Sequence, residues 1–70
     1  MPFYYFNKNT DNHSRHEVHS EECTYCPDIE NRTFIGFELS CKAAIEHAKK
    51  EYPYKDFDGC YWCCRECHKG

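Results

Sequence analysis

The chain has few of the aliphatic side chains that fill the core of an ordinary domain. Leu, Ile and Val contribute five of the 70 residues, namely Val18, Ile29, Ile35, Leu39 and Ile45. Ordering a chain of this length costs on the order of 100 kcal/mol of conformational entropy, which so few aliphatic side chains do not offset with margin. We therefore expect residues 1–70 to form a single small domain that needs a metal ion, disulfides or a partner subunit for stability.

The sequence also lacks long apolar segments. None approaches the roughly 18 residues that a membrane-spanning helix requires. The first residues, Met-Pro-Phe-Tyr-Tyr-Phe-Asn, have neither the basic nor the apolar region of a signal peptide. We therefore expect no contact with a membrane and a cytoplasmic location, where thiols stay reduced.

Positive charge is scarce and scattered. The formal net charge is −3, and of the nine Lys and Arg residues only Lys42, Lys49 and Lys50 fall on one predicted element. Nucleic-acid-binding domains usually carry a basic patch, so the charge balance argues against a nucleic acid partner. The sequence shows neither a Ser/His/Asp constellation nor a phosphate-binding loop, and we expect that the protein is not an enzyme.

Cysteine and histidine are abundant instead, with seven and five residues respectively. Three Cys-x-x-Cys pairs occur: Cys23/Cys26, Cys60/Cys63 and Cys64/Cys67. Such a turn lets two thiolates meet one tetrahedral Zn²⁺ ion at about 2.3 Å each. An odd number of cysteines leaves one unpaired in any disulfide framework. The sequence therefore favours a metal over disulfides, and predicts one structural Zn²⁺ ion.

More side chains are available than a tetrahedral ion needs. The candidate ligands are His19, Cys23, Cys26, Cys60, Cys63, Cys64, Cys67 and His68. We favour Cys60 and Cys63 first, because Gly59 frees the backbone at the start of their turn, and Cys23 next. The fourth ligand is His19, Cys67 or Cys26, in that order of preference. The predicted metal-ligand set is His19, Cys23, Cys60, Cys63 and Cys67.

The periodicity predicts an α+β fold with a small, mainly antiparallel sheet of two or three strands. Strand-forming or alternating residues cover 3–7, 15–19 and 33–39. In the last of these segments, alternation predicts that four side chains share one face: Thr33, Ile35, Phe37 and Leu39. A Cys-rich turn or short helix is expected near the C-terminus, closing against His19 and Cys23.

One helix is predicted over residues 41–52. Ser40 is a good N-cap, and Pro53 ends the helix. The apolar positions recur with helical spacing and form one face, which should pack on the 33–39 strand: Cys41, Ala44, Ile45, Ala48 and Tyr52. On this face Cys41 is expected to be a small apolar core residue.

Three segments carry a resemblance to known proteins. They read His-Glu-Val-His-Ser-Glu-Glu-Cys, then Gly-Phe-Glu-Leu-Ser-Cys-Lys-Ala-Ala-Ile-Glu-His-Ala, then Gly-Cys-Tyr-Trp-Cys-Cys-Arg-Glu-Cys-His. This pattern resembles a group of small bacterial Cys/His-rich proteins along most of the chain. That group has an apolar residue where Cys26 stands here, so the resemblance disfavours Cys26 as a ligand. It implies no activity.

A looser resemblance is to the metal-binding N-terminal domain of Ada DNA-repair proteins. There a Cys-x3-Cys pair, a strand, an Ala-rich helix and a Cys-x-x-Cys pair surround one Zn²⁺ ion. Here His19-x3-Cys23, the 33–39 strand, the 41–52 helix and Cys60-x-x-Cys63 follow the same order over about 45 residues. His19 replaces a cysteine, and the basic DNA-contacting character is missing. The resemblance thus implies the architecture, without the methyl-accepting thiolate or DNA binding.

Three functions are compatible with these features. A zinc-stabilised module that binds a protein partner is favoured, because 12 aromatic residues exceed what so small a core can hide. The aromatic side chains expected to contribute to an exposed patch are Phe3, Tyr4, Tyr5, Phe6, Tyr52, Tyr54, Tyr61 and Trp62. Alternatively, the aromatic side chains themselves form the core. Thiol redox chemistry at a Cys-x-x-Cys pair and metal storage are the other functions.

Overall fold

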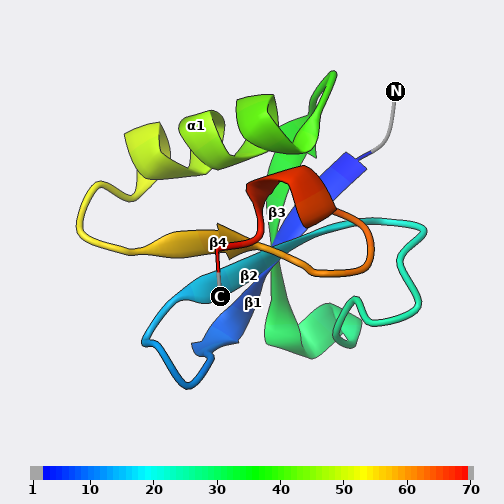
Figure 1. Cartoon of the computed structure of the whole chain (residues 1–70), viewed down its shortest axis with the longest axis horizontal. Helices are drawn as coiled ribbons and strands as arrows, with labels where there is room; N and C mark the ends of the chain where they lie inside the picture. Colours follow the sequence, from blue (N-terminus) through cyan, green and yellow to red (C-terminus); the bar gives the residue numbers. More distant parts are fainter. Residues whose placement is uncertain (1–2, 70) are drawn as a thin grey trace.

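The computed structural model describes residues 3–69, which form one helix on one face of a four-stranded sheet (Figure 1). The elements are β1 (Phe3–Thr10), β2 (His16–Ser20), η1 (Ile29–Asn31), β3 (Arg32–Phe37), α1 (Cys41–Glu51), β4 (Phe57–Gly59) and η2 (Arg65–Cys67). The sheet order is β3-β1-β2-β4, with β1 antiparallel to both neighbours and β4 parallel to β2. The predicted α+β class is confirmed, whereas the sheet has four strands rather than two or three and is mixed.

Strand β4 is the element that the sequence analysis missed. It is only three residues long, and all three are buried. Its residues pair in register with β2, with His16 opposite Phe57 and Val18 opposite Gly59. A segment this short shows no alternation in the sequence, so its strand character depends on the neighbour it pairs with.

Strand β3 lies at one edge of the sheet and contains an irregularity. Tyr4 pairs with Gly36 while the next residue, Tyr5, pairs with Phe34, so Ile35 is an extra residue in β3. The predicted alternation through Leu39 is therefore wrong. Ile35 points into the core, whereas Phe37 is exposed and Leu39 is 78% exposed beyond the strand. A one-residue insertion reverses the face of every side chain that follows it.

The helix α1 agrees with its prediction. The Ser40 hydroxyl accepts a hydrogen bond from the backbone N–H of Ala43 at 3.2 Å and so caps the first turn. The helix ends at Glu51, two residues before Pro53. Cys41, Ala44 and Ala48 are buried and pack against β2, β3 and β4 rather than against β3 alone. No helix among residues 3–69 is long and apolar enough to cross a membrane.

Aromatic rings supply much of the core between the sheet and α1. Phe6 packs edge to face on Phe57 and on Tyr52, with ring centroids 5.0 and 5.4 Å apart. Tyr4 is also buried, so two of the eight aromatic residues expected in a surface patch belong to the core. Tyr5 and Tyr52 are half-buried. The exposed members of the predicted set are Phe3, Tyr54, Tyr61 and Trp62.

The C-terminal segment is fixed to the sheet by the buried carboxylate of Asp58, which is 1% exposed. Its Oδ1 atom accepts hydrogen bonds from the backbone N–H groups of Gly59 and Lys69, the latter at 2.8 Å. Its Oδ2 atom lies 3.4 Å from the Arg15 guanidinium and 3.7 Å from the His68 ring. A buried charge needs such partners, so Asp58 holds the tail against β4.

Gly59 is required by close packing. A Cβ atom at this position would lie 2.5 Å from the Cys64 carbonyl oxygen and 2.7 Å from the Cys67 Cβ atom. We predict that Gly59→Ala lowers the free energy of unfolding by about 1–3 kcal/mol, because the C-terminal turn must move away from β4. Denaturant unfolding of the two proteins measures this difference, and an unchanged midpoint would contradict the packing described.

The imidazole of His47 should make stability depend on pH. Its Nδ1 atom lies 2.7 Å from a Glu38 carboxylate oxygen and its Nε2 atom 3.4 Å from Glu51. The hydrogen bond to Glu38 raises the pKa of His47, with a smaller contribution from Glu51 against the opposing effect of burial. The protonated form is therefore favoured in the folded state. This stabilisation is complete below the unfolded pKa of about 6.5 and is lost as the pH rises through the folded pKa.

We therefore predict that the unfolding free energy of the wild type falls above pH 6.5 relative to that of His47→Gln. Unfolding curves across this range test the prediction, and NMR titration of the ring in Glu38→Gln should give a lower pKa. The matched variant Glu51→Gln should lower the pKa less, because its carboxylate is farther away. Parallel stability profiles for the wild type and His47→Gln would refute the assignment.

Candidate metal centre

Four predicted ligands meet at one end of the β2–β4 strand pair. His19 lies in β2 and Cys23 in the loop after it, whereas Cys60 directly follows β4 and Cys63 comes three residues later. Because β2 and β4 are parallel, their carboxyl ends lie at the same edge of the sheet. The backbone N–H of Cys60 donates to the Val18 carbonyl at 3.0 Å, which places Cys60 beside His19.

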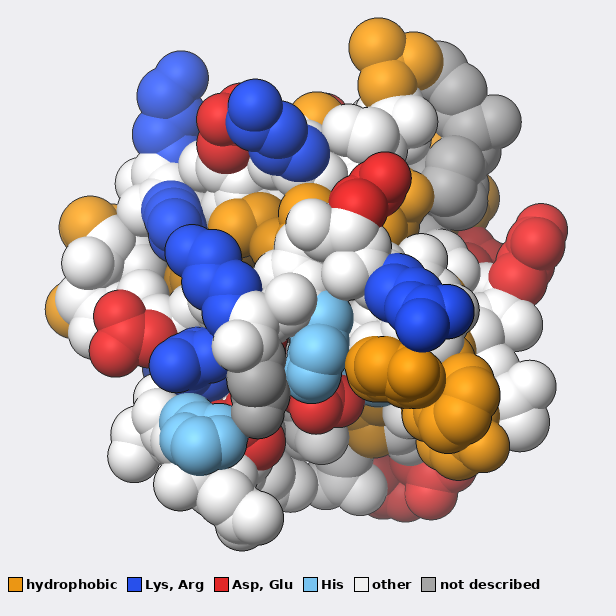
Figure 2. All heavy atoms as spheres, viewed as in Figure 1, with side chains coloured by type: hydrophobic (Ala, Val, Ile, Leu, Met, Phe, Trp, Pro, Cys, Tyr) orange, Lys and Arg blue, Asp and Glu red, His pale blue; other side chains and the backbone are white. Residues whose placement is uncertain are grey.

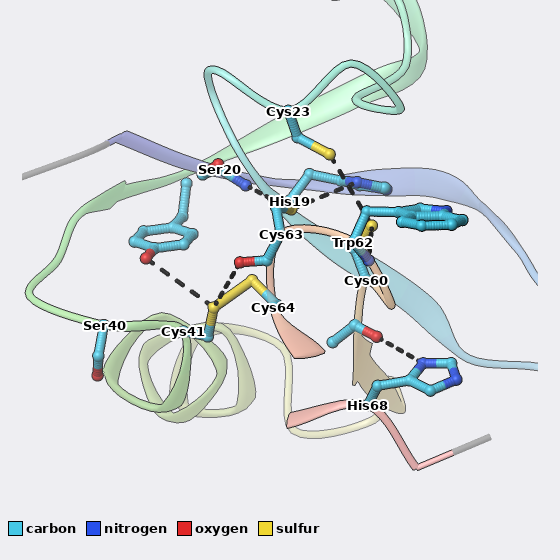
Figure 3. The surroundings of a disulfide bond; sticks show 12 residues. His19, Ser20, Cys23, Ser40, Cys41, Cys60, Trp62, Cys63, Cys64 and His68 are labelled. Carbon is cyan, nitrogen blue, oxygen red and sulfur yellow. Dashed lines mark hydrogen bonds between the residues drawn. A yellow bond between two sulfur atoms is a disulfide. The ribbon is translucent and has the colours of Figure 1, made fainter. Parts of the chain in front are cut away.

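The ligand atoms of these four residues lie within 4.8 Å of one another. The sulfur atoms of Cys23 and Cys60 are 3.9 Å apart, and the Cys63 sulfur is 4.0 Å from the His19 Nδ1 atom (Figure 3). Two sulfur atoms at 2.3 Å from a tetrahedral ion are separated by about 3.8 Å. The spacing therefore fits a single tetrahedral metal ion with one nitrogen and three sulfur ligands.

Backbone N–H groups point at two of the sulfur atoms. Ser20 donates to the Cys63 sulfur at 3.3 Å, and Trp62 donates to the Cys60 sulfur at 3.4 Å. A tight turn joins the last two ligands, since the N–H of Cys64 donates to the Cys60 carbonyl at 2.8 Å. Hydrogen bonds of this kind stabilise thiolates and orient them toward a metal.

Burial makes the unliganded thiolates unfavourable. It raises the pKa of the Cys60 thiol and raises that of Cys63 to about 12, with the nearby Cys23 sulfur adding to both effects. Burial also lowers the pKa of His19, which keeps the imidazole in the neutral form that binds metals. The site thus favours either protonated thiols or a bound cation that neutralises the thiolates.

Glu17 lies beside the histidine ligand on the same face of β2. Its carboxylate oxygen is 3.5 Å from the Nε2 atom of His19, the ring nitrogen opposite the one that faces Cys63. Metal-bound histidines usually have a carboxylate or carbonyl at this second nitrogen, which fixes the ring and its tautomer. Burial raises the pKa of Glu17, and the carboxylates of Asp11 and Asp58 act in the same direction.

The remaining candidate ligands lie outside this group. Cys67, the fifth residue of the predicted set, is half-buried in η2 and packs against Gly59. The Cys26 sulfur accepts a hydrogen bond from the Arg32 guanidinium at 3.4 Å. The His68 ring contacts the Gly59 carbonyl at 2.9 Å. Each of the three therefore has a different local contact.

Cys41 and Cys64 form a disulfide that joins the first residue of α1 to the segment before η2 (Figure 3). Their Cα atoms are 5.6 Å apart, and both residues are buried. Cys41 is thus a core residue, as predicted, but it is not an unpaired thiol. The sequence favoured a metal over disulfides, whereas the structure has this disulfide beside the four residues that could hold a metal. The 23-residue separation of Cys41 and Cys64 gives no local signal for pairing.

Aromatic side chains lie beside the turns that carry the candidate ligands. The rings of Tyr25 and Trp62 stack with centroids 5.4 Å apart, and each is the third residue of a Cys-x-x-Cys sequence. Tyr61 packs edge to face on Trp62, and the Arg65 guanidinium lies over the Tyr61 ring at 4.9 Å. Sequence reasoning listed Tyr61 and Trp62 but missed Tyr25, although the matching position in the two turns was a usable signal.

Comparison of the chain with protein-family models, with curated proteins and with solved structures finds no match. The assignment of the site therefore depends on its own geometry.

Substitutions can distinguish the four candidate metal ligands from the cysteines that lie outside the group. We predict that Cys23→Ser and Cys63→Ser each weaken metal binding at least about 100-fold, because loss of a direct ligand exceeds the usual effect of an outer partner. Cys67→Ser and Cys26→Ser are matched controls that should retain the metal. Elemental analysis of the purified proteins measures the content. Metal loss in Cys67→Ser together with retention in Cys23→Ser would contradict the grouping.

Proposed function

We propose that His19, Cys23, Cys60 and Cys63 bind one Zn²⁺ ion, and that the protein is a zinc-stabilised binding module without catalytic activity. The observation that carries the zinc assignment is the single cluster of three thiols and one imidazole at tetrahedral spacing. Soft sulfur ligands in a tetrahedral arrangement favour Zn²⁺ over ions that prefer oxygen ligands. The same four ligands could hold Fe²⁺ instead, and elemental analysis distinguishes the two metals.

A structural role for the ion follows from the number of ligands. Four protein ligands fill a tetrahedral Zn²⁺ ion and leave no position for a substrate or an activated water molecule. The ion would also connect β2 with the segment after β4, two parts of the chain that are about 40 residues apart in a fold with few aliphatic core residues. Binding free energy at such a site contributes to folding.

The disulfide does not favour a thiol redox activity. Catalytic cysteines need an accessible sulfur, whereas Cys41 and Cys64 are only 3% and 1% exposed. Both cysteines of the Cys60-x-x-Cys63 pair belong to the metal-binding group. We therefore propose that this disulfide has a structural role and that the ligand thiols are reduced.

The distribution of aromatic side chains supports a binding role. Phe3, Phe34 and Phe37 are exposed on the face of the sheet opposite α1, and Tyr61 and Trp62 are exposed beside the metal-binding turns. Exposed aromatic groups of this kind are typical of surfaces that contact other proteins. A protein partner is therefore favoured over a small substrate.

Native mass spectrometry of protein made in zinc-supplemented medium tests the proposal. We expect one Zn²⁺ ion per chain, lost on treatment with a chelator, and a lower Tm for the chelated protein because the β2–β4 connection is released. Alkylation after chelation should label five thiols, the cysteines outside the disulfide, and all seven after reduction. A protein without metal, or one whose Tm a chelator leaves unchanged, would overturn the zinc assignment.

A further inference from the structure

A groove separates α1 from the C-terminal segment on the side of β4. Its volume is about 290 Å³, at the lower end of the range for ligand pockets and large enough for one apolar side chain with its flanking backbone. Neither the metal centre nor the aromatic face of the sheet contributes to it. The residues that line the groove are Lys42, Ile45, Glu46, Lys49, Phe57, Glu66, Cys67 and Lys69.

The floor of the groove is apolar. It is formed by Ile45 from α1, Phe57 from β4 and Cys67 from η2, all of which belong to the core or pack against it. Phe57 is buried, and Ile45 and Cys67 are half-buried. An apolar side chain from a partner would therefore extend the existing core, as the anchor residues of protein interfaces do.

Lysine side chains lie on both sides of the groove. Lys42 and Lys49 are seven residues apart on α1, and Lys69 faces them from the tail. Among residues 3–69, none of the three ammonium groups has a carboxylate oxygen within 4.0 Å. Figure 2 shows Lys and Arg side chains gathered on this side of the molecule, with hydrophobic atoms exposed between them.

Two carboxylates, those of Glu46 and Glu66, also line the groove. The net charge of its lining is therefore about +1, in a protein whose overall formal charge is −3. Burial raises the pKa of the Cys67 thiol on the floor, Glu66 adds to the effect, and the ammonium groups of Lys42 and Lys69 oppose it.

The two walls of the groove are held at a fixed separation. Lys42 follows Cys41, which the disulfide links to Cys64 just before η2. On the other side, the backbone N–H of Lys69 donates to the buried Asp58 carboxylate at 2.8 Å. Walls connected in this way need little ordering when a ligand binds, which favours affinity.

We propose that this groove binds a short acidic peptide segment of a partner protein, with one apolar side chain on the Ile45–Phe57 floor and flanking carboxylates at Lys42, Lys49 and Lys69. The proposal names the partner of the binding module proposed above and deepens that function. Carboxylates of the peptide would form ion pairs with the ammonium groups of the three lysines, while its apolar side chain would fill the cavity. Charge complementarity of this kind sets both specificity and the rate of association.

An acidic peptide fits the groove better than a nucleic acid does. Bases of a single strand need exposed aromatic rings for stacking, whereas the only ring in the lining, that of Phe57, is buried. An RNA that binds more tightly than the peptide would therefore overturn the proposal.

The test uses the full chain and a fluorescent peptide with a central leucine between Asp and Glu residues. Fluorescence anisotropy should give saturable binding that weakens with salt, with amide NMR shifts confined to α1, β4 and the segment from η2 to Lys69. Lys49→Glu should weaken binding about 10-fold. Lys50→Glu is the matched control, because it changes the net charge equally on the next residue of α1 but lies outside the groove. It should change affinity less than about 2-fold.

Three outcomes would overturn the proposal: no saturable binding, equal weakening by Lys49→Glu and Lys50→Glu, or unchanged affinity when glycine replaces the leucine of the peptide. Zinc content is measured in the same samples. If the protein holds one Zn²⁺ ion per chain but does not bind the peptide, the peptide-binding proposal is overturned and the zinc assignment stands. Folded protein that binds the peptide without metal overturns the zinc assignment alone.

Discussion

The parallel pairing of β2 with β4 is the contact on which the rest of the structure depends. Only three residues of each strand take part, yet this pairing sets His19 beside Cys60 and brings the loops that carry Cys23 and Cys63 to the same edge. A ladder this short has little stability alone. A metal ion at its end would hold the two strands together, so the strand pairing and the metal site support each other.

Three cross-links of different chemistry compensate for the scarcity of aliphatic residues. A metal ion at the candidate site would join β2 to the segment after β4, the Cys41–Cys64 disulfide joins that segment to α1, and Asp58 holds the tail through two backbone N–H groups. All three converge on residues 58–69. This segment, which contains the end of β4 and the short helix η2, is therefore the part that closes the fold. Aromatic packing around Phe6 supplies the remaining core.

The sequence predicts the elements whose signals are local and misses those that arise from tertiary contacts. The α1 helix is predicted by the Ser40 cap, the spacing of its small apolar residues and Pro53, and these signals are all local in the sequence. Strand β4 and the extra residue at Ile35 do not, because each exists only through a neighbouring strand. For the same reason the sequence placed Cys60, Cys63 and Cys23 first among eight candidates and preferred His19 to Cys67 as the fourth ligand, but kept both in the predicted set. That choice depends on β2 and β4 being adjacent and parallel.

Two consecutive cysteines, Cys63 and Cys64, link the candidate metal centre to the start of α1. The Cys63 sulfur lies in the metal-binding group, and the Cys64 sulfur is bonded to the start of α1. Cys67, three residues later, contributes to the floor of the lysine-rimmed groove. The candidate metal centre and the groove are therefore joined through only a few residues of backbone and the Cys41–Cys64 disulfide.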